Sequence, residues 1–281
     1  MSAPLRLDRF LIRAEGPEAL SFLDSLFTQS LSRLEQAPCV YAGLLTPQGK
    51  VMADMIVWAT PDGVLIETDP ATGPALLTKL SMYKLRANAT LSDATQELCV
   101  VWRLENGEAS ALADPRMPDG GLGFRRIAPR GEAAALESGE DALRALMIEQ
   151  GVPDLARDGG LQDAFGLEAL FEELHGVDFK KGCFVGQENV SRMKRRATTR
   201  KKFCRIAFEG EAPSIGAPVR AGAAEIGNVR AIGQGRAMAF LRLDRAREAA
   251  EKNVPLEADG KAIRLDPPAW LIMPAADQEG A

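Results

Sequence analysis

The chain has 281 residues, of which 46% are apolar and 26% charged, and its formal net charge is −5. A chain of this length usually divides into two or three domains, and the negative charge argues against a nucleic-acid binder that acts through bulk charge. No apolar run is long enough to cross a membrane, and residues 1–13 lack the apolar core of a secretory signal. The sequence therefore predicts a cytoplasmic protein that is not membrane-bound.

The cysteines and the single histidine limit the chemistry further. With His175 alone, Ser/His/Asp and Cys/His catalysis have almost no candidate, and the sequence around it is typical of a helix end. The four cysteines are far apart and form no CxxC pair, which argues against a metal site or a self-contained cluster site. They are Cys39, Cys99, Cys183 and Cys204.

The first half of the chain alternates between strand and helix patterns. Helical spacing of apolar residues covers residues 17–28 and 71–85. Strand patterns cover residues 5–13, 40–45, 51–60, 64–68, 89–92 and 97–104, with a Pro-Gly turn at 46–49. This mixture of antiparallel hairpins and helices predicts an α+β layer fold.

The second half predicts a change of architecture. Residues 113–123 are rich in Pro, Gly and Asp and indicate a loop between subdomains. Helices are expected over 140–150, ended by Gly151, over 166–174, and from about Gly186 onward. The short apolar segments that follow are split by Gly, Pro and Asp, which is typical of a small all-β barrel; they are 203–208, 218–220, 225–230, 236–241 and 263–265. We therefore predict a domain over 1–198, with two lobes that meet near 110–125, and a barrel domain over 199–281.

The stretch around Cys183 carries candidate chemistry. Lys180, Lys181 and a flexible Gly182 precede it, and a helix is expected just after it. Neighbouring cations and a helix dipole both stabilise a thiolate, which would make Cys183 the most reactive of the four cysteines. The residues alone are equally compatible with a small buried cysteine in a tight turn.

This stretch resembles a known family. Residues 181–188 look like the K-G-C-[FY]-x-G-Q-E signature of YgfZ proteins and their mitochondrial iron–sulfur assembly homologues. The matching residues are Lys181, Gly182, Cys183, Phe184, Val185, Gly186, Gln187 and Glu188, with Arg192 in the extended motif. Residues 44–50 resemble the family's turn after its first long strand, and residues 148–153 resemble its I-E-A-G-x-P segment. The resemblance spans the chain and is weaker in the C-terminal barrel.

The resemblance implies a fold like the glycine-cleavage T-protein, with lobes arranged as a ring around a folate site and a small β-barrel at the C-terminus. It implies tetrahydrofolate or a derivative as the cofactor. It also implies an accessory role for [4Fe–4S] client enzymes, including tRNA methylthiolation enzymes, in which the signature cysteine is implicated. Whether the protein turns over a substrate stays open. The alternative is a folate-dependent aminomethyltransferase of the T-protein type.

Two acidic residues are the candidates for holding the pterin, because a carboxylate can accept two N–H donors of its edge in parallel. Glu149 lies on the predicted helix 140–150, at the position of the T-protein's pterin-binding glutamate; the alternative is an exposed helix-end residue. Asp54 interrupts the almost wholly apolar stretch 51–58, where a carboxylate is costly unless it faces a cavity or a partner. It matches the T-protein aspartate that acts on folate, so Asp54 joins Cys183 as a catalytic candidate. The alternative is an edge-strand aspartate that points to water.

A basic run follows the signature. It could be a solvated linker, a patch for the polyanionic tail of folate, or a surface for RNA or an acidic partner. No aromatic residue interleaves residues 192–202, so direct nucleic-acid binding is not expected. Nothing in the sequence demands more than a monomer. The run contains no acid and consists of Arg192, Lys194, Arg195, Arg196, Arg200, Lys201, Lys202 and Arg205.

Overall fold

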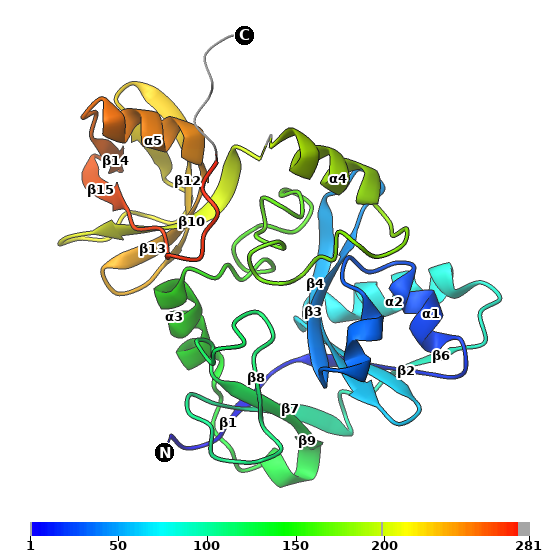
Figure 1. Cartoon of the computed structure of the whole chain (residues 1–281). Helices are drawn as coiled ribbons and strands as arrows, with labels where there is room; N and C mark the ends of the chain where they lie inside the picture. Colours follow the sequence, from blue (N-terminus) through cyan, green and yellow to red (C-terminus); the bar gives the residue numbers. More distant parts are fainter. Residues whose placement is uncertain (1, 198, 275–281) are drawn as a thin grey trace.

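The computed structural model describes residues 2–197 and 199–274, which form three lobes arranged in a ring (Figure 1). The lobes are a five-stranded sheet with its helices, a four-stranded sheet, and a closed barrel. Residue 198, at the predicted domain boundary, and residues 275–281 of the predicted barrel domain lie outside the described residues. No helix within the described ranges has the length and apolar character needed to cross a bilayer.

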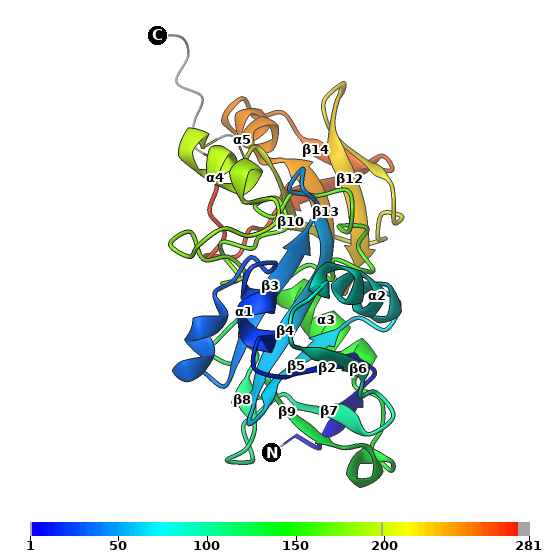
Figure 2. The same cartoon turned by 90° about the vertical axis from the view of Figure 1, so that its right-hand side faces the viewer.

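The five-stranded sheet is antiparallel throughout. Alternation along its strands gives it two different faces. Two helices, α1 (Ala19–Asp24) and α2 (Gly73–Lys84), lie on one face over an apolar cluster that includes Met55, Val57 and Ile66. The opposite face turns toward the centre of the ring (Figure 1), and Figure 2 shows α1 and α2 in front of the sheet. The strands lie in the order β3 (Cys39–Leu45), β4 (Val51–Thr60), β5 (Gly63–Thr68), β2 (Phe10–Glu15) and β6 (Thr90–Asp93).

The four-stranded sheet corrects two expectations. The single strand predicted over residues 5–13 is two strands in two different sheets, because Asp8 and Arg9 leave the ladder and bind Glu140 instead. The Pro-Gly-Asp stretch 113–123 lies within this lobe, not between lobes. It leads into a strand over 124–129, which the sequence patterns did not predict because Arg125 and Arg126 interrupt its apolar residues. The order is β1 (Leu5–Leu7), β7 (Leu98–Arg103), β9 (Phe124–Pro129) and β8 (Leu112–Ala113).

The remaining helices near the ring centre follow local signals with one exception. Helix α3 (Glu140–Gln150) has the predicted bounds and ends at Gly151, whose φ of +77° is the left-handed cap that glycine favours. The predicted helix over 166–174 is wrong: these residues form turns, and Leu170 at φ +65° interrupts any helix there. Two short 3₁₀ helices, η1 (Leu31–Glu35) and η2 (Arg130–Ala133), complete the two α+β lobes.

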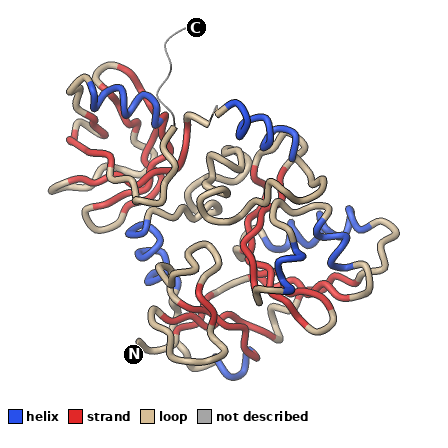
Figure 3. The backbone as a smooth tube through the Cα atoms, in the orientation of Figure 1, coloured by secondary structure: helices blue, strands red, loops and turns tan. Residues whose placement is uncertain are grey.

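The C-terminal lobe is a closed barrel (Figure 3). Its core includes Phe203 stacked on Phe240, with ring centroids 4.7 Å apart. Helix α4 (Gln187–Arg196) precedes the barrel, and helix α5 (Leu243–Glu251), which the sequence patterns did not predict, packs on it. The barrel strands are β10 (Lys201–Phe208), β11 (Pro218–Ala221), β12 (Ala224–Ile232), β13 (Arg236–Arg242), β14 (Leu256–Ala258) and β15 (Lys261–Leu265).

Candidate functional site

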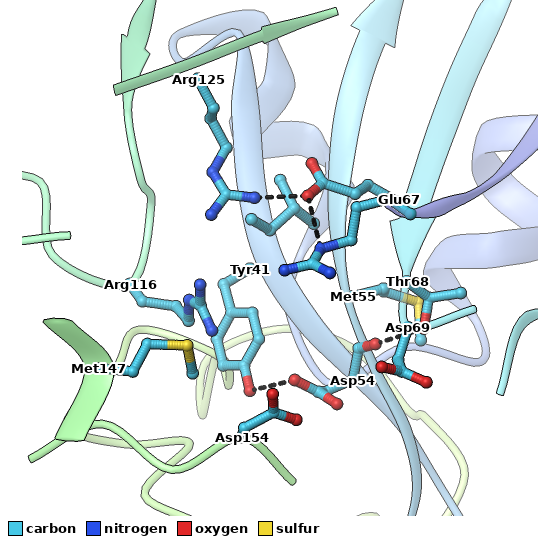
Figure 4. A pocket seen from close by; sticks show the side chains of 12 residues that line it. Tyr41, Asp54, Met55, Glu67, Thr68, Asp69, Arg116, Arg125, Met147 and Asp154 are labelled. Atoms are coloured by element: carbon cyan, nitrogen blue, oxygen red, sulfur yellow. Dashed lines mark hydrogen bonds and ion pairs between the residues drawn. The ribbon is translucent and has the colours of Figure 1, made fainter. Parts of the chain in front are cut away.

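A polar pocket lies at the centre-facing side of the five-stranded sheet, where the four-stranded lobe and α3 meet it (Figure 4). As it stands, the pocket is narrow, with about 50 Å³ open to the centres of water-sized molecules. The charged residues in its wall outnumber the apolar ones. The wall consists of Arg9, Tyr41, Asp54, Met55, Ile56, Glu67, Thr68, Asp69, Arg116, Arg125, Met147 and Asp154.

Asp54 lies in this pocket and not in water. Along β4 its neighbours Ala53 and Met55 are buried in the cluster beneath the helices, so alternation turns the Asp54 side chain toward the ring centre. The Tyr41 hydroxyl donates a hydrogen bond to Asp54 Oδ2 at 3.0 Å (Figure 4). Burial raises the pKa of Asp54 to about 6, with Asp154 adding to the rise and Arg116 opposing it. A carboxyl group with such a pKa can both donate and accept a proton near neutrality.

A chain of buried charges forms one side of the pocket. Arg116 binds Asp114 through two hydrogen bonds of 3.0 and 2.7 Å, and Arg125 joins Asp114 to Glu67. Although burial alone would raise it, the two arginines hold the pKa of Asp114 well below its usual range. Glu67 also accepts the indole N–H of Trp58 at 3.0 Å. Because these charges are paired with one another, this wall is preformed and its groups are not free to bind a ligand.

Arg116 reaches from this wall across the pocket. Its guanidinium lies 5.8 Å from the centre of the Tyr41 ring, and Figure 4 shows it beside Tyr41 and Met147. Asp154 lies on another part of the rim, where its side chain is 19% exposed. Its carboxylate lies 3.6 Å from Arg157 and 3.9 Å from Arg144. Asp54, Asp69 and Asp154 are the carboxyl groups of the wall that a ligand could reach, while Glu67 is buried and fully engaged.

Several residues of this pocket were not predicted from the sequence. Glu67 sits in an apolar strand, as Asp54 does, and the same signal could have found it. Asp154 follows the 148–153 segment directly but carries no pattern of its own. Arg116 and Arg125 had no signal, because nothing local indicates that an arginine 58 residues from Glu67 will bind it.

Glu149, the other acid expected to hold folate, lies apart from Asp54. Its carboxylate pairs with Arg236 of β13, and the Arg236 Nε in turn donates to Asp266 Oδ2 at 2.9 Å. The Glu149 side chain is 50% exposed, and it is Met147 of the same helix that lines the pocket. Glu149 therefore tethers α3 to the barrel, and its role toward a pterin stays a prediction from the resemblance.

The signature around Cys183 folds as a loop followed by a helix, as predicted. The buried ammonium group of Lys181 donates to the backbone oxygens of Asp24, Phe27 and Gln29 at 2.6, 2.8 and 3.0 Å, and also contacts the Asp24 carboxylate. This cation therefore closes the carboxyl end of α1 and does not face the thiol. Burial lowers the pKa of Lys181, against the opposing effect of Asp24. The expectation that Lys181 stabilises a thiolate directly is corrected accordingly.

The first turn of α4 packs on the β3–β4 turn, so two segments of the family resemblance meet in space. Gly186 has φ +81°, and a Cβ there would lie 2.6 Å from the Thr46 oxygen and 3.1 Å from Gly49 Cα. Asn189 Nδ2 donates to the Gln48 oxygen at 3.0 Å. The glycines at 49 and 186 are thus required by this close approach.

The other signature residues stabilise the same loop. Phe184 is buried, and the Gln187 side chain donates to the Gly182 oxygen at 3.2 Å. Arg192 donates to the Asn189 side chain at 2.7 Å. Glu188 is exposed on the first turn of α4.

Among the four cysteines, Cys183 is the exposed one. The other three are buried, and burial raises the pKa of Cys39 and of Cys204 to about 12. These two thiols are therefore inert at neutral pH. Cys183 does not line the central pocket. Within the described ranges, no three His, Cys, Asp or Glu side chains are grouped so as to hold a metal ion.

Comparisons with known proteins agree with this architecture. Residues 200–272 match the family model of the CAF17 C-terminal beta-barrel domain. The whole chain superposes on the glycine cleavage system aminomethyltransferase T from Bartonella henselae with a TM-score of 0.75 at 16% identity, covering 96% of this chain and 87% of that one. The predicted fold class, T-protein-like lobes with a C-terminal β-barrel, is confirmed, and at this identity the likeness concerns the fold alone.

Several related sequences are named as iron–sulfur cluster assembly factors. The chain is 30% identical over 225 residues to the mitochondrial iron-sulfur cluster assembly factor IBA57 homolog of Mycosarcoma maydis, covering 71% of this chain and 55% of that protein. It is 28% identical over 248 residues to mouse IBA57 and 29% identical over 247 residues to human IBA57, and in each case it covers 68% of the relative. The chain thus spans about half the length of the fungal relatives and about two thirds of the mammalian ones.

These relatives correct one expectation. The prediction of a cytoplasmic location is wrong, because the relatives are mitochondrial proteins. The prediction rested on the lack of a secretory signal and of membrane-length apolar runs. Neither feature distinguishes the cytoplasm from the interior of an organelle.

Proposed function

We propose that this protein is an assembly or maintenance factor for iron–sulfur enzymes, that it binds a reduced folate in the central pocket, and that it acts through the thiol of Cys183. One observation carries the proposal. A buried lysine and two close-packed glycines hold the signature loop, and Cys183 on this loop is exposed. The other three cysteines are buried elsewhere in the fold. The names of the IBA57 relatives support the same role.

The exposed thiol limits what the protein does alone. An iron–sulfur cluster takes about four cysteine-type ligands, and the buried Cys39, Cys99 and Cys204 are spread over different strands. Cys183 therefore acts as a single sulfur ligand toward a cluster that the client supplies. We propose that the clients include tRNA methylthiolation enzymes and that the protein works as a monomer.

The chemistry of the pocket suits a reduced pterin. Asp54 and Asp154 provide carboxyl groups for the N–H donors of the pterin edge, and Tyr41 and Met147 provide apolar surface beside them. The free space is smaller than typical ligand pockets of about 300 Å³ or more, so we expect the Met147 side chain to shift when folate enters. Asp54, with its pKa near neutrality, would exchange a proton with the bound ring.

Two measurements test the proposal. In a strain that lacks the endogenous protein, Cys183→Ser should lower the methylthiolation of tRNA by about tenfold or more while leaving tetrahydrofolate affinity unchanged. Cys204→Ser, a buried cysteine, serves as the control. Normal tRNA methylthiolation with Cys183→Ser as the only copy would contradict the role of this thiol.

Equilibrium dialysis of tetrahydrofolate tests the pocket. Asp154→Asn and Asp54→Asn should each weaken binding by about tenfold, the value of a charge-assisted hydrogen bond. The matched variant Glu149→Gln decides between the two acids of the 148–154 region: a loss confined to Glu149→Gln would return the pterin site to the residue that the resemblance indicated. No binding to the wild-type protein would remove folate from the proposal.

A second candidate is a folate-dependent aminomethyltransferase. It is favoured by Asp54, a carboxyl group with a raised pKa inside the pocket. An assay with a lipoylated carrier bearing a glycine-derived aminomethyl group and tetrahydrofolate distinguishes the two. Turnover that disappears with Asp54→Asn and survives Cys183→Ser would establish the transferase instead.

A further inference from the structure

The outward face of α4 is strongly basic although the protein as a whole is acidic. Val190 and Met193 turn inward, since Val190 is buried and Met193 packs on the core. At 100° per residue, Arg192, Arg195 and Arg196 lie on the opposite side, where all three are exposed. Figures 1 and 2 both show α4 at the rim of the molecule, between the five-stranded lobe and the barrel.

These three arginines differ from other residues of the basic run, several of which form ion pairs within the protein. Lys202 is buried against Glu173, Arg205 pairs with Asp266, and Lys194 pairs with Glu172. By contrast, Arg192 and Arg195 donate to neutral groups: the Asn189 amide oxygen and the Ser191 carbonyl oxygen.

The structure also brings this helix beside the signature loop. The Lys194 ammonium lies 5.5 Å from the centre of the Phe179 ring, and the Gln187 side chain binds the Gly182 oxygen. Phe179 is 40% exposed, and Lys180 and Cys183 are exposed next to it. An exposed thiol just before α4 and an exposed aromatic ring in contact with Lys194 of α4 therefore lie beside the helix that carries the three exposed arginines. Glu188 is the one acid on the outward face of α4.

We infer that this region, defined as Phe179, Lys180, Cys183, Arg192, Arg195 and Arg196, is the docking surface for an acidic segment of a protein partner, which it guides to the Cys183 thiol. The inference rests on the proposed function in one respect, namely that the partner is an iron–sulfur protein. Charge complementarity raises the encounter rate by tenfold or more at low ionic strength. A protein is favoured over RNA because the aromatic surface is a single ring, which is no stacking platform for successive bases.

A thiol-exchange reaction tests the surface without folate, cluster or client. Cys183 is first converted with 2,2′-dithiodipyridine to its 2-thiopyridyl disulfide, which is selective because the other three cysteines are buried. The thiolate of a short peptide then attacks the Cys183 sulfur. A peptide–Cys183 disulfide forms, and pyridine-2-thione leaves with the electron pair and is measured by absorbance. One peptide has its cysteine flanked by glutamates and the other has it flanked by glutamines.

The triple variant Arg192→Glu, Arg195→Glu, Arg196→Glu should react with the glutamate peptide at least about tenfold more slowly than wild type at low ionic strength. The difference should shrink as salt is added, and the glutamine peptide should react equally with both proteins. The matched control is Arg86→Glu, Arg220→Glu, Arg264→Glu, three exposed arginines elsewhere with the same total change of charge. It should stay within about twofold of wild type.

Equal glutamate-peptide rates in the triple variant and the control would overturn the inference. So would salt-dependent tRNA binding that the triple variant loses while its glutamate-peptide rate is unchanged, since the face would then serve nucleic acid. Failure of folate binding or of client activity leaves this reaction unaffected, so the two proposals fail separately.

Discussion

In the central pocket, charged side chains from distant stretches of the chain are buried and neutralise one another, whereas around Cys183 a contiguous segment holds one thiol in the open. Asp114, Arg125 and Glu67 come from three separate stretches of the chain and are joined by ion pairs. The loop 181–186 is fixed by one lysine and the turn beneath it. This difference indicates that each buried charge of the pocket wall is needed to keep its paired neighbours stable in the folded protein. A thiol on a short anchored loop can instead change partners without disturbing the core.

The pocket wall should be the more sensitive of the two regions. Asp114→Asn leaves Arg116 and Arg125 buried without their shared carboxylate, and we expect it to lower the free energy of unfolding by about 3–5 kcal/mol. Urea unfolding followed by circular dichroism measures this. The exposed Asp62→Asn should cost less than about 0.5 kcal/mol. A loss below about 1 kcal/mol for Asp114→Asn would mean that the buried charges are not interdependent.

Neighbouring lysines sharpen the comparison within the signature. Lys181→Met leaves the oxygens of Phe27 and Gln29 without their buried donor and should cost about 2 kcal/mol of unfolding free energy. Lys180→Met removes an exposed cation and should change stability by less than about 0.5 kcal/mol. Equal effects of the two changes, measured by urea unfolding, would show that the loop is not anchored through Lys181.

An effect of about the same size as that of Lys181→Met concerns Asp54 and depends on pH. Its folded-state pKa of about 6 is above the ordinary value of 3.8, so the folded protein holds the proton more tightly than the unfolded chain does. The stability that this proton contributes is present below the ordinary pKa and is lost as pH rises through about 6. Between about pH 4.5 and about pH 7.5, wild type should therefore lose about 2 kcal/mol relative to Asp54→Asn.

Urea unfolding of both proteins at the two pH values measures this double difference, in which the other titrating groups cancel. Asp62→Asn again provides the control and should track wild type at both pH values. A pH-independent gap between wild type and Asp54→Asn would indicate that Asp54 ionises as it does in water.

Local signals predicted the elements that depend on neighbours along the chain. Gly151 ended α3 where expected, and the apolar strands and the barrel followed from their alternation and their Gly-Pro breaks. The signature also predicted the helix start after Gly186. The helix predicted over 166–174 was wrong because Leu170, which is not a glycine, has a left-handed backbone conformation. Tertiary packing imposes this conformation, which local preference disfavours.

The sequence by itself determined the fold class and the signature loop, because both depend on alternation, turn residues and contiguous motifs. Only the tertiary structure decided which charges meet. It turned Asp54 inward beside Tyr41, joined Arg125 to Glu67 across two sheets, and directed Glu149 to the barrel. The physical reason is that an ion pair between elements far apart in sequence depends on how the lobes pack, which no local pattern encodes.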